Sequence, residues 1–403
     1  MDEPIGCLEI TSSGVKFLVG YMFNNNVYVL HALESTRAKS VKGLIEDRDE
    51  MVIAIKELIS SASSTLKLQI KKVVFCVPSV GLQIYQEQGE TNTTESNVSL
   101  FDANNCVTII KKKIDKIKDD NSCVIDVVPF GYILSDEKTY NRLPLNKVSN
   151  QLLMQADVEV MDSIWIETMK SIIKEAGLEV LKIVNGANAS LQYIKKYNNT
   201  FNEYIFIDVG SRTTTIAASY AGRLISSDVL YYGSDNITDH IAEKYHINFN
   251  KANEYKEVYG LSKNPAFIFK TENDFTLNEL SDTIKESLAN ITSFIDKFVS
   301  TVNQSTKNLF ILSGGGSNLL GFDSYLNSKY LNKILIFTPT NYGARSNSYE
   351  NLISSLSYFN DYEVKSSVYR PNDLTLTRVG GLSNPIIEKD EIDDADNQDD
   401  EIL

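Results

Sequence analysis

The stretch Tyr204–Tyr220, with the sequence YIFIDVGSRTTTIAASY, limits the fold of this chain more than any other segment. Two short apolar runs flank a polar turn that contains glycine, and this order predicts a β-hairpin. Asp208 stands at the entrance of the turn, and Gly210 and Thr213 lie within it. A carboxylate can hold Mg²⁺ or its water, and backbone N–H groups beside a glycine can hold a phosphate. The stretch is therefore either an ordinary polar hairpin or a phosphate loop.

A second hairpin of the same kind is predicted at the start of the chain. Apolar runs at 5–10 and 15–19 surround the turn Thr11-Ser12-Ser13-Gly14, and Glu9 stands near its entrance. A further apolar run follows each hairpin, at 26–30 and at 223–231. The two turns lie about two hundred positions apart, and this spacing suggests two related halves.

A third loop follows the apolar run 308–312, which leads into Ser313 and then Gly314, Gly315 and Gly316. A helix is expected from about Asn318. Glycines between a strand and a helix N-terminus allow a phosphate or a base to lie against the backbone. The loop matches neither the P-loop nor the dinucleotide-binding pattern, and alone it is a weak signal. Three such loops, each at the end of a strand, indicate a nucleotide cleft much more specifically.

The remaining pattern predicts an α/β protein of more than one domain, as 403 residues suggest. A helix at 47–66 and a strand at 73–77 complete a mixed sheet with a covering helix. The residue pattern changes between about 81 and 160. Here a polar, loop-like segment, 86–105, precedes a Lys-rich helix, 107–117. Regular apolar spacing over 276–302 predicts the longest helix. Further strands are expected at 123–134, 151–160, 178–184 and 334–337, and further helices at 162–176, 187–197, 233–246, 251–259 and 348–358.

Composition excludes several classes of protein. No apolar run is long enough to span a bilayer, and the acidic N-terminus lacks the basic region of a signal peptide, so we expect a cytoplasmic protein. The net charge is −14, and 388–401 alone holds nine acids and one lysine, which argues against a nucleic-acid partner. The Lys-rich helix is most simply a solvated face. The four cysteines, Cys7, Cys76, Cys106 and Cys123, have the spacing of reduced thiols, and the three histidines form no metal motif.

In this order the three loops resemble those of the actin-like, sugar-kinase and heat-shock-chaperone ATPase superfamily. Within it the chain is most similar to the FtsA-like bacterial cell-division proteins, over about 5–358. The inserted segment 81–160 also falls where FtsA-like proteins carry their own insertion. The matching segments are SVKGLIED at 40–47, AGLEV at 176–180, DVGSRTTTIA at 208–217, GSDNITDHIA at 233–242, ANEYKEVYG at 252–260 and LSGGGSNLLG at 312–321.

The resemblance implies an α/β, actin-like ATPase fold with two related halves, each a mixed β-sheet flanked by helices, and an FtsA-type inserted subdomain. The first half is expected at 1–80 and 161–197, with a late helix near 348–360 returning to it. The inserted subdomain is expected at 81–160, the second half at 198–247 and 304–347, its helical subdomain at 248–303, and an irregular to disordered acidic tail at 363–403.

Departures from the family pattern bear on activity. Glu9, Thr11 and Ser12 stand where the family has Asp, Gly and Thr, and Ser211-Arg212 replaces two glycines. Thr215 replaces an Asp and Asn253 a ribose-binding Glu. Arg212 is either a new phosphate ligand, a block to the site or a solvent-facing side chain. Because hydrolysis needs an oriented water and a metal, we expect ATP or ADP to bind with Mg²⁺ and turn over slowly or not at all.

The resemblance also assigns candidate site residues. Asp208 is the catalytic candidate, and Glu9 and Asp208 are the candidate Mg²⁺ ligands, through water. The nucleotide-binding candidates are Glu9, Thr11, Ser12, Ser13, Gly14, Gly210, Ser211, Arg212, Thr213, Thr214, Gly233, Asn253, Lys256, Gly314, Gly315 and Gly316.

Three functions stay open at this point. The first is an actin-like scaffold that polymerises and recruits the division tubulin homologue FtsZ. The second is a PilM-like pilus-assembly scaffold of the same fold, and the third is a small-molecule kinase of the superfamily. FtsA-like proteins usually end in a basic amphipathic helix, whereas this tail is acidic. Contact with the cytoplasmic face of the membrane at the division site is therefore an open expectation.

Overall fold

The computed structural model describes residues 4–24, 26–41, 44–94, 96–197, 200–262, 270–302, 309–330, 333–366 and 377–378. Within them, two five-stranded sheets repeat one topology: β12-β7-β1-β2-β3 and β17-β16-β13-β14-β15. In each sheet three consecutive antiparallel strands are extended by two parallel ones. The predicted duplication and mixed sheets are thereby confirmed. The first sheet comprises β1 (Ile5–Ile10), β2 (Val15–Phe23), β3 (Asn26–Ser35), β7 (Lys72–Val77) and β12 (Glu179–Asn185), and the second β13 (Tyr204–Val209), β14 (Thr214–Tyr220), β15 (Arg223–Leu230), β16 (Leu309–Ser313) and β17 (Lys333–Ile336).

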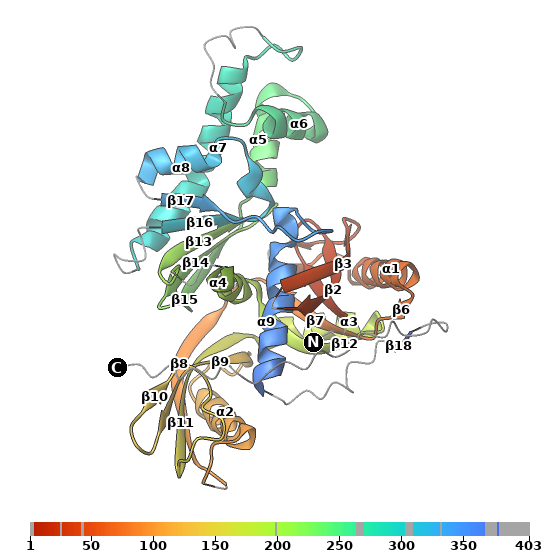
Figure 1. Ribbon diagram of the computed structural model, residues 1–403. Helices are drawn as coiled ribbons and strands as arrows, with labels where there is room; N and C mark the ends of the chain where they lie inside the picture. Colours follow the sequence, from red (N-terminus) through yellow and green to blue (C-terminus); the bar gives the residue numbers. More distant parts are fainter. Residues whose placement is uncertain are drawn as a thin grey trace.

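Helices cover both faces of the first sheet, which is why its central strand β1 is buried along its whole length. On one face lie α1 (Arg48–Leu66) and α3 (Ser163–Glu175), whose apolar side chains share a core with β1, β2 and β7. On the other face lie α4 (Gly186–Tyr197) and α9 (Glu350–Ser366). Since α4 also packs against the second sheet, these two helices lie between the halves (Figure 1).

The second half carries its own helices, α5 (Ser234–Tyr245), α6 (Phe249–Tyr259), α7 (Leu277–Val299) and α8 (Phe322–Tyr330). The predicted longest helix is α7, and its predicted capping box is present, since Thr276 accepts from the Glu279 N–H. The apolar stripe of α7 faces a core shared with α5, α6 and β13. The helices α5, α6 and α7 extend away from the second sheet at the top of Figure 1.

The inserted subdomain is a four-stranded sheet, β10-β9-β11-β8, packed on one helix. Its elements are β8 (Gln83–Asn92), α2 (Leu100–Ile114), β9 (Ser122–Leu134), β10 (Thr139–Tyr140) and β11 (Gln151–Asp162). The loop predicted at 86–105 is wrong, because most of it forms β8 and the start of α2. The strand escaped the sequence pattern because it is a polar edge strand, and Gly89 allows α2 to approach: a Cβ there would lie 2.4 Å from the Cys106 carbonyl oxygen.

Two ion pairs join the inserted subdomain to the two halves. Lys182 of β12 bonds Asp126 of β9, with Nζ and Oδ1 2.7 Å apart and both side chains buried. Tyr358 of α9 donates to the other oxygen of Asp126 at 2.8 Å. On the second half, Arg223 of β15 forms a bidentate pair with Asp157 of β11. The inserted sheet is therefore attached to both halves.

Short elements complete the described chain. They are β4 (Ser40–Val41) paired with β5 (Leu44–Ile45), β6 (Leu68–Gln69) paired with β18 (Thr377–Arg378), and the 3₁₀ turns η2 (Gly315–Asn318) and η3 (Asn347–Tyr349). The helix predicted from about Asn318 is displaced, since η2 ends there and α8 begins at Phe322 after Gly321, which has φ +81°. Of the predicted tail, 363–366 continue α9, and the rest, apart from 377–378, lies outside the described residues.

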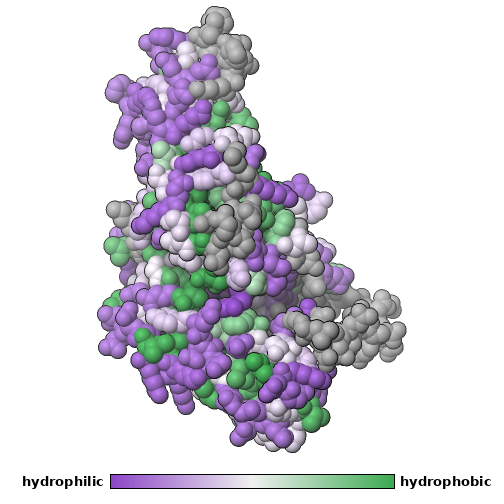
Figure 2. Space-filling view, turned by 90° about the vertical axis from the view of Figure 1, so that its left-hand side faces the viewer, coloured by the Kyte–Doolittle hydropathy of each residue, from purple (hydrophilic) through white to green (hydrophobic). Residues whose placement is uncertain are grey.

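No helix in the described ranges is long and apolar enough to cross a membrane. The face shown in Figure 2 is mainly hydrophilic in its upper part, with separate hydrophobic patches lower down. All four cysteines are free thiols, as predicted, and three of them are buried.

Candidate functional site

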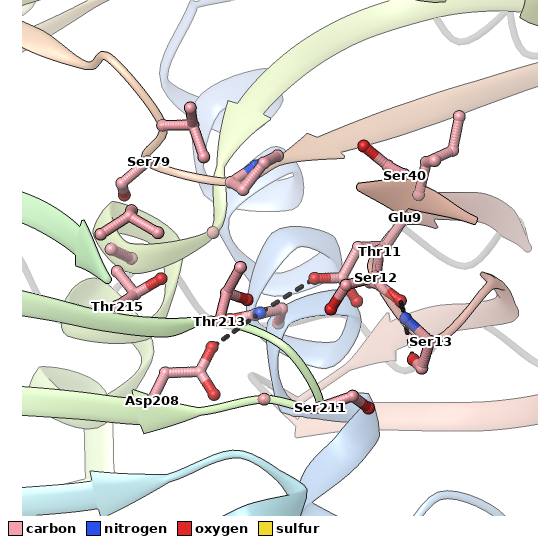
Figure 3. A pocket seen from close by; sticks show the side chains of 18 of the residues that line it. Glu9, Thr11, Ser12, Ser13, Ser40, Ser79, Asp208, Ser211, Thr213 and Thr215 are labelled. Carbon is pink, nitrogen blue, oxygen red and sulfur yellow. Dashed lines mark hydrogen bonds between the residues drawn. The ribbon is translucent and has the colours of Figure 1, made fainter. Parts of the chain in front are cut away.

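Glu9 and Asp208 occupy equivalent positions, each one residue before the end of the central strand of its sheet. Glu9 pairs with Lys16 across the first hairpin and Asp208 with Thr215 across the second. Both acids line one cavity of about 100 Å³ between the halves (Figure 3). Its other lining residues are Ile10, Thr11, Ser12, Ser13, Ser40, Pro78, Ser79, Val80, Gly186, Ala187, Phe206, Gly210, Ser211, Thr213, Thr215, Val229, Tyr231 and Asn351.

The first turn is held by its own hydroxyls. Thr11 N donates to the Gly14 carbonyl at 2.8 Å, and the Thr11 and Ser13 hydroxyls bond each other at 2.8 Å. Gly14 has φ +147°, and a Cβ there would lie 2.0 Å from the Ser35 carbonyl oxygen. Close packing against β3 therefore requires glycine at this position. Ser12 reaches across the cleft, where its hydroxyl accepts from the Arg212 N–H at 3.2 Å.

The second turn is tied to the start of α5. The carbonyl groups of Gly210 and Ser211 accept from the N–H groups of Ser234 and Asp235, at 2.9 and 2.7 Å. A Cβ on Gly233 would lie 2.5 Å from the Gly210 oxygen, so this contact requires glycine. These bonds satisfy two of the N–H groups that a helix leaves free at its N-terminus.

Eight predicted ligands of this half do not line the cavity: Arg212, Thr214, Gly233, Asn253, Lys256, Gly314, Gly315 and Gly316. The Thr214 hydroxyl donates to the Tyr232 carbonyl, inside the sheet edge. Asn253 bonds Glu257 on its own helix. Arg212 turns to α5, where its guanidinium pairs with the two acids Asp235 and Asp239. To act as a phosphate ligand, the first of the three alternatives, Arg212 would therefore have to break these ion pairs.

Lys256 is buried and held by three oxygen acceptors. Its Nζ donates to the Ser234 carbonyl at 3.0 Å, to the Ser234 hydroxyl at 2.8 Å and to the Thr238 hydroxyl at 2.7 Å. Burial lowers the pKa of Lys256, and the nearby Asp235 opposes this shift. The lysine thus connects α6 to the N-terminal turn of α5, next to the second loop.

The triple glycine packs directly on β13. Gly314 has φ +79°, and a Cβ there would lie 2.1 Å from the Asp208 Oδ1 atom. A Cβ on Gly316 would lie 2.5 Å from the Val209 side chain, whereas one on Gly315 would meet nothing within 4 Å. Two of the three glycines are therefore required by the packing of the protein itself, and Gly315 alone faces open space.

Sequence reasoning missed Asn351, which lines the cavity, and two charged residues close to its acids, Glu350 and Lys16. Asn351 of α9 donates through Nδ2 to Glu9 Oε1 at 2.9 Å and to Asp208 Oδ2 at 3.2 Å. Its neighbour Glu350 accepts from the hydroxyls of Ser313 and Ser354. Lys16, two residues after Gly14, bonds the Ser348 carbonyl at 2.6 Å. The available signal was a basic residue just after the first turn and a polar pair at the start of a predicted helix.

Burial makes the negative charges of this cleft costly. It raises the pKa of Glu9 and of Asp208, and Lys16 and Asn351 partly offset the rise. Burial and the neighbouring Asp208 raise the pKa of Glu350 to about 7. In addition, the buried Oε2 atom of Glu9 has no hydrogen-bond partner. A cation would relieve each of these costs.

The donor set fits Mg²⁺, which favours oxygen ligands and is usually bound by one or two carboxylates together with phosphate oxygens. The described residues contain no cluster of three or more His, Cys, Asp or Glu side chains that could hold a metal alone. A larger hollow of about 680 Å³ lies between β9, β12 and α3, and no predicted site residue lines it.

Several known proteins are similar to this chain. The cell division protein FtsA of Staphylococcus epidermidis RP62A is 25% identical over 362 residues, covering 87% of this chain and 77% of that protein. FtsA of Bacillus subtilis 168 is 21% identical over 368 residues, 85% and 80% of the two chains. A PilM–PilN type IV pilus biogenesis complex aligns with TM-score 0.60 and 14% identity over 89% and 99% of the chains. Spiroplasma citri MreB5 bound to ADP aligns with TM-score 0.54 and 14% identity over 91% and 98%.

Fold and cleft together define the class: this is a protein of the actin-like ATPase fold. The family model of the cell division protein FtsA matches residues 205–357, which contain the second loop, the triple glycine and the start of α9. The chain is therefore similar to the FtsA cell-division proteins, at an identity of 21–25% to the two relatives above. The family resemblance and the fold class expected from the sequence are both confirmed.

Proposed function

We propose that this chain is an actin-like scaffold of cell division that binds ATP or ADP with Mg²⁺ in the cleft between its halves, recruits FtsZ and hydrolyses nucleotide weakly or not at all. The observation that carries the nucleotide site is the meeting of Glu9 and Asp208, from equivalent strands, in a cavity lined by hydroxyls. The structure of Spiroplasma citri MreB5, a protein of similar fold, contains bound ADP, which supports the same class of ligand for this cleft.

Each residue type in the cleft has a chemical task in this proposal. The hydroxyls of Ser12, Ser13 and Thr213, with the backbone N–H groups of both turns, would bind phosphate oxygens. Gly315 would leave room for the nucleoside. Glu9 and Asp208 would hold the cation through water, and the bound ion would neutralise phosphate charge.

Binding requires the halves to move apart. The cavity of about 100 Å³ is smaller than the roughly 300 Å³ at the lower end of ligand sites. The hydrogen bond between Ser12 and Arg212 crosses the cleft, and Asn351 bridges acids of both halves. Nucleotide entry therefore breaks or rearranges these contacts, and amide hydrogen exchange at the two turns should report it.

Weak hydrolysis is expected because the second turn offers no free carboxylate to act as a base. Asp208 accepts from Asn351 and packs against Gly314, and Thr215 lines the cavity where the family has an Asp. A threonine hydroxyl is a poor acceptor of a proton from water compared with a carboxylate.

Titration with a fluorescent ATP analogue tests the site. Binding at micromolar to low millimolar concentration is expected, weakened by Asp208→Asn. Absence of binding at about millimolar nucleotide would refute the proposed site. Fast steady-state phosphate release that Asp208→Asn abolishes would refute the weak-hydrolysis part.

The partner proposal follows from the FtsA relatives. We expect the protein at the cytoplasmic face of the membrane at the division site, self-associating into filaments and docking FtsZ. Co-sedimentation with FtsZ polymers, with and without ATP, tests this. The likeness to the PilM–PilN complex favours a pilus-assembly scaffold as the second candidate. Failure to co-sediment with FtsZ, together with neighbouring genes for pilus components, would favour that function instead.

A further inference from the structure

Asn351 links acids from both halves of the protein through a single nitrogen atom. The Nδ2 atom carries two hydrogens, and the two carboxylates Glu9 and Asp208 accept one each, at 2.9 and 3.2 Å. Both dashed bonds meet between the labelled acids in Figure 3. Ionised carboxylates accept but do not donate, so the nitrogen of the amide must face them.

The opposite end of the same amide is also held. Ser190 of α4 donates to Asn351 Oδ1 at 3.2 Å, and Ser190 is completely buried. At Gly186 the α4 backbone approaches so closely that a Cβ would lie 3.3 Å from the Asn351 amide. The side chain is therefore fixed in orientation, as expected of a group whose position matters for the cleft.

Electrostatics explain why the two acids need such a group. Each lies within about 3.2 Å of one nitrogen, so two like charges share one small volume. The charge on Asp208 adds to the burial that raises the pKa of Glu9. Of the described cations, Lys16 stabilises both acids, whereas Arg212 is engaged by Asp235 and Asp239. The Asn351 amide, which donates to both carboxylates, thus offsets their mutual repulsion, a task that a cation shared by the two acids could also perform.

We propose that Asn351 is a positioning residue that takes the place of a divalent cation: without a cation it clamps Glu9 of the first half to Asp208 of the second, and a cation at these carboxylates displaces it. This inference deepens the proposed function, since it concerns the cation of the same cleft. It makes the closed, cation-free cleft a stable state of the protein.

The substitution Asn351→Asp tests the clamp, because it removes both donor hydrogens and adds a third carboxylate. We expect a Tm in EDTA at least about 2 °C below that of the wild type, and recovery of most of this loss in millimolar Mg²⁺ or Mn²⁺. Binding of Mn²⁺ alone, followed by electron paramagnetic resonance without nucleotide, should become at least about tenfold tighter. Asn360→Asp is the control, since Asn360 is buried on the same helix outside the cavity lining and should show no recovery by cation.

Several outcomes would overturn the proposal. One is a loss of stability in Asn351→Asp that is the same with and without cation, and another is no loss in EDTA. If this variant fails to fold, Asn351→Ala decides, because it removes the clamp without adding charge. The alanine variant should then gain a larger Mg²⁺-dependent rise in Tm than the wild type, and an unchanged rise would refute the clamp. Nucleotide titration is a separate readout, so failure of the nucleotide site would not be mistaken for failure of the clamp.

Discussion

Replacing Glu350 by glutamine should remove a pH-dependent loss of stability from this protein. Only 1% of Glu350 is exposed, and its oxygens accept from the hydroxyls of Ser354 at 2.8 Å and Ser313 at 3.3 Å. Burial, and next the charge of Asp208, raise the pKa of Glu350 from 4.5 to about 7. A raised carboxyl pKa means that the folded state holds the proton more tightly than the unfolded state does.

The sign and size of the effect follow from this difference. Below about pH 4.5 the group is neutral in both states and costs nothing. As the pH rises, the unfolded state ionises first, so the free energy of unfolding falls until the pH passes about 7. At about 1.4 kcal/mol per pKa unit, the full loss is about 3 kcal/mol. Glutamine is neutral throughout and still bonds both hydroxyls, so Glu350→Gln should not suffer this loss.

Urea unfolding between pH 5 and pH 8, in EDTA and without nucleotide, measures the effect. The difference in unfolding free energy between Glu350→Gln and the wild type should grow by about 2 kcal/mol over this range, in favour of the variant. Glu243→Gln, at an exposed position of α5, is the matched control and should give a constant difference. A constant difference for Glu350→Gln as well would refute the argument that this carboxyl is buried with its proton.

Other predictions concern packing, ion pairs and thiols. Gly314→Ala should destabilise the protein by roughly 2 kcal/mol or more in thermal unfolding, because a Cβ there meets a carboxylate oxygen at 2.1 Å, whereas Gly315→Ala should cost less than about 1 kcal/mol. Asp157→Asn should cost about 2 kcal/mol and increase hydrogen exchange in β15 and β11, because it leaves the largely buried Arg223 without its bidentate partner; unchanged exchange would contradict this. A thiol reagent should label Cys123 first in the native protein, since it is the one cysteine that is not fully buried, and an undiminished fast phase in Cys123→Ser would contradict this.

Local patterns predicted the parts of the site that one segment builds by itself. Each hairpin turn carries its acid, its glycine and its hydroxyls within a few consecutive residues, so Glu9 and Asp208 were found from the sequence. Their meeting in one cavity follows from the duplicated sheet topology. The triple glycine was also visible, although its tight fit against Asp208 and Val209 needed coordinates.

The contribution of α9 was not predictable in the same way. Its apolar spacing indicated a helix that packs on a sheet, and that spacing says nothing about the polar residues at its first turn. Asn351 reaches Glu9 across 342 positions and Asp208 across 143, so the contacts depend on how the chain returns between the halves. Arg212 illustrates the converse: its partners on α5 are near in sequence, but charge alone did not distinguish an ion pair from a phosphate ligand.

The two ion pairs of the inserted sheet have a mechanical consequence. Lys182 and Arg223 attach interior residues of the long strands, Asp126 of β9 and Asp157 of β11, to different halves, and the strands continue from there away from both (Figure 1). From Asp126 to the end of β9 at Leu134 the strand is roughly 26 Å long. A relative rotation of about 10° between the halves would thus displace the far tip by roughly 5 Å, since the displacement is the product of this length and the angle. Small relative movements of the two halves would therefore produce larger displacements at the far end of the inserted sheet.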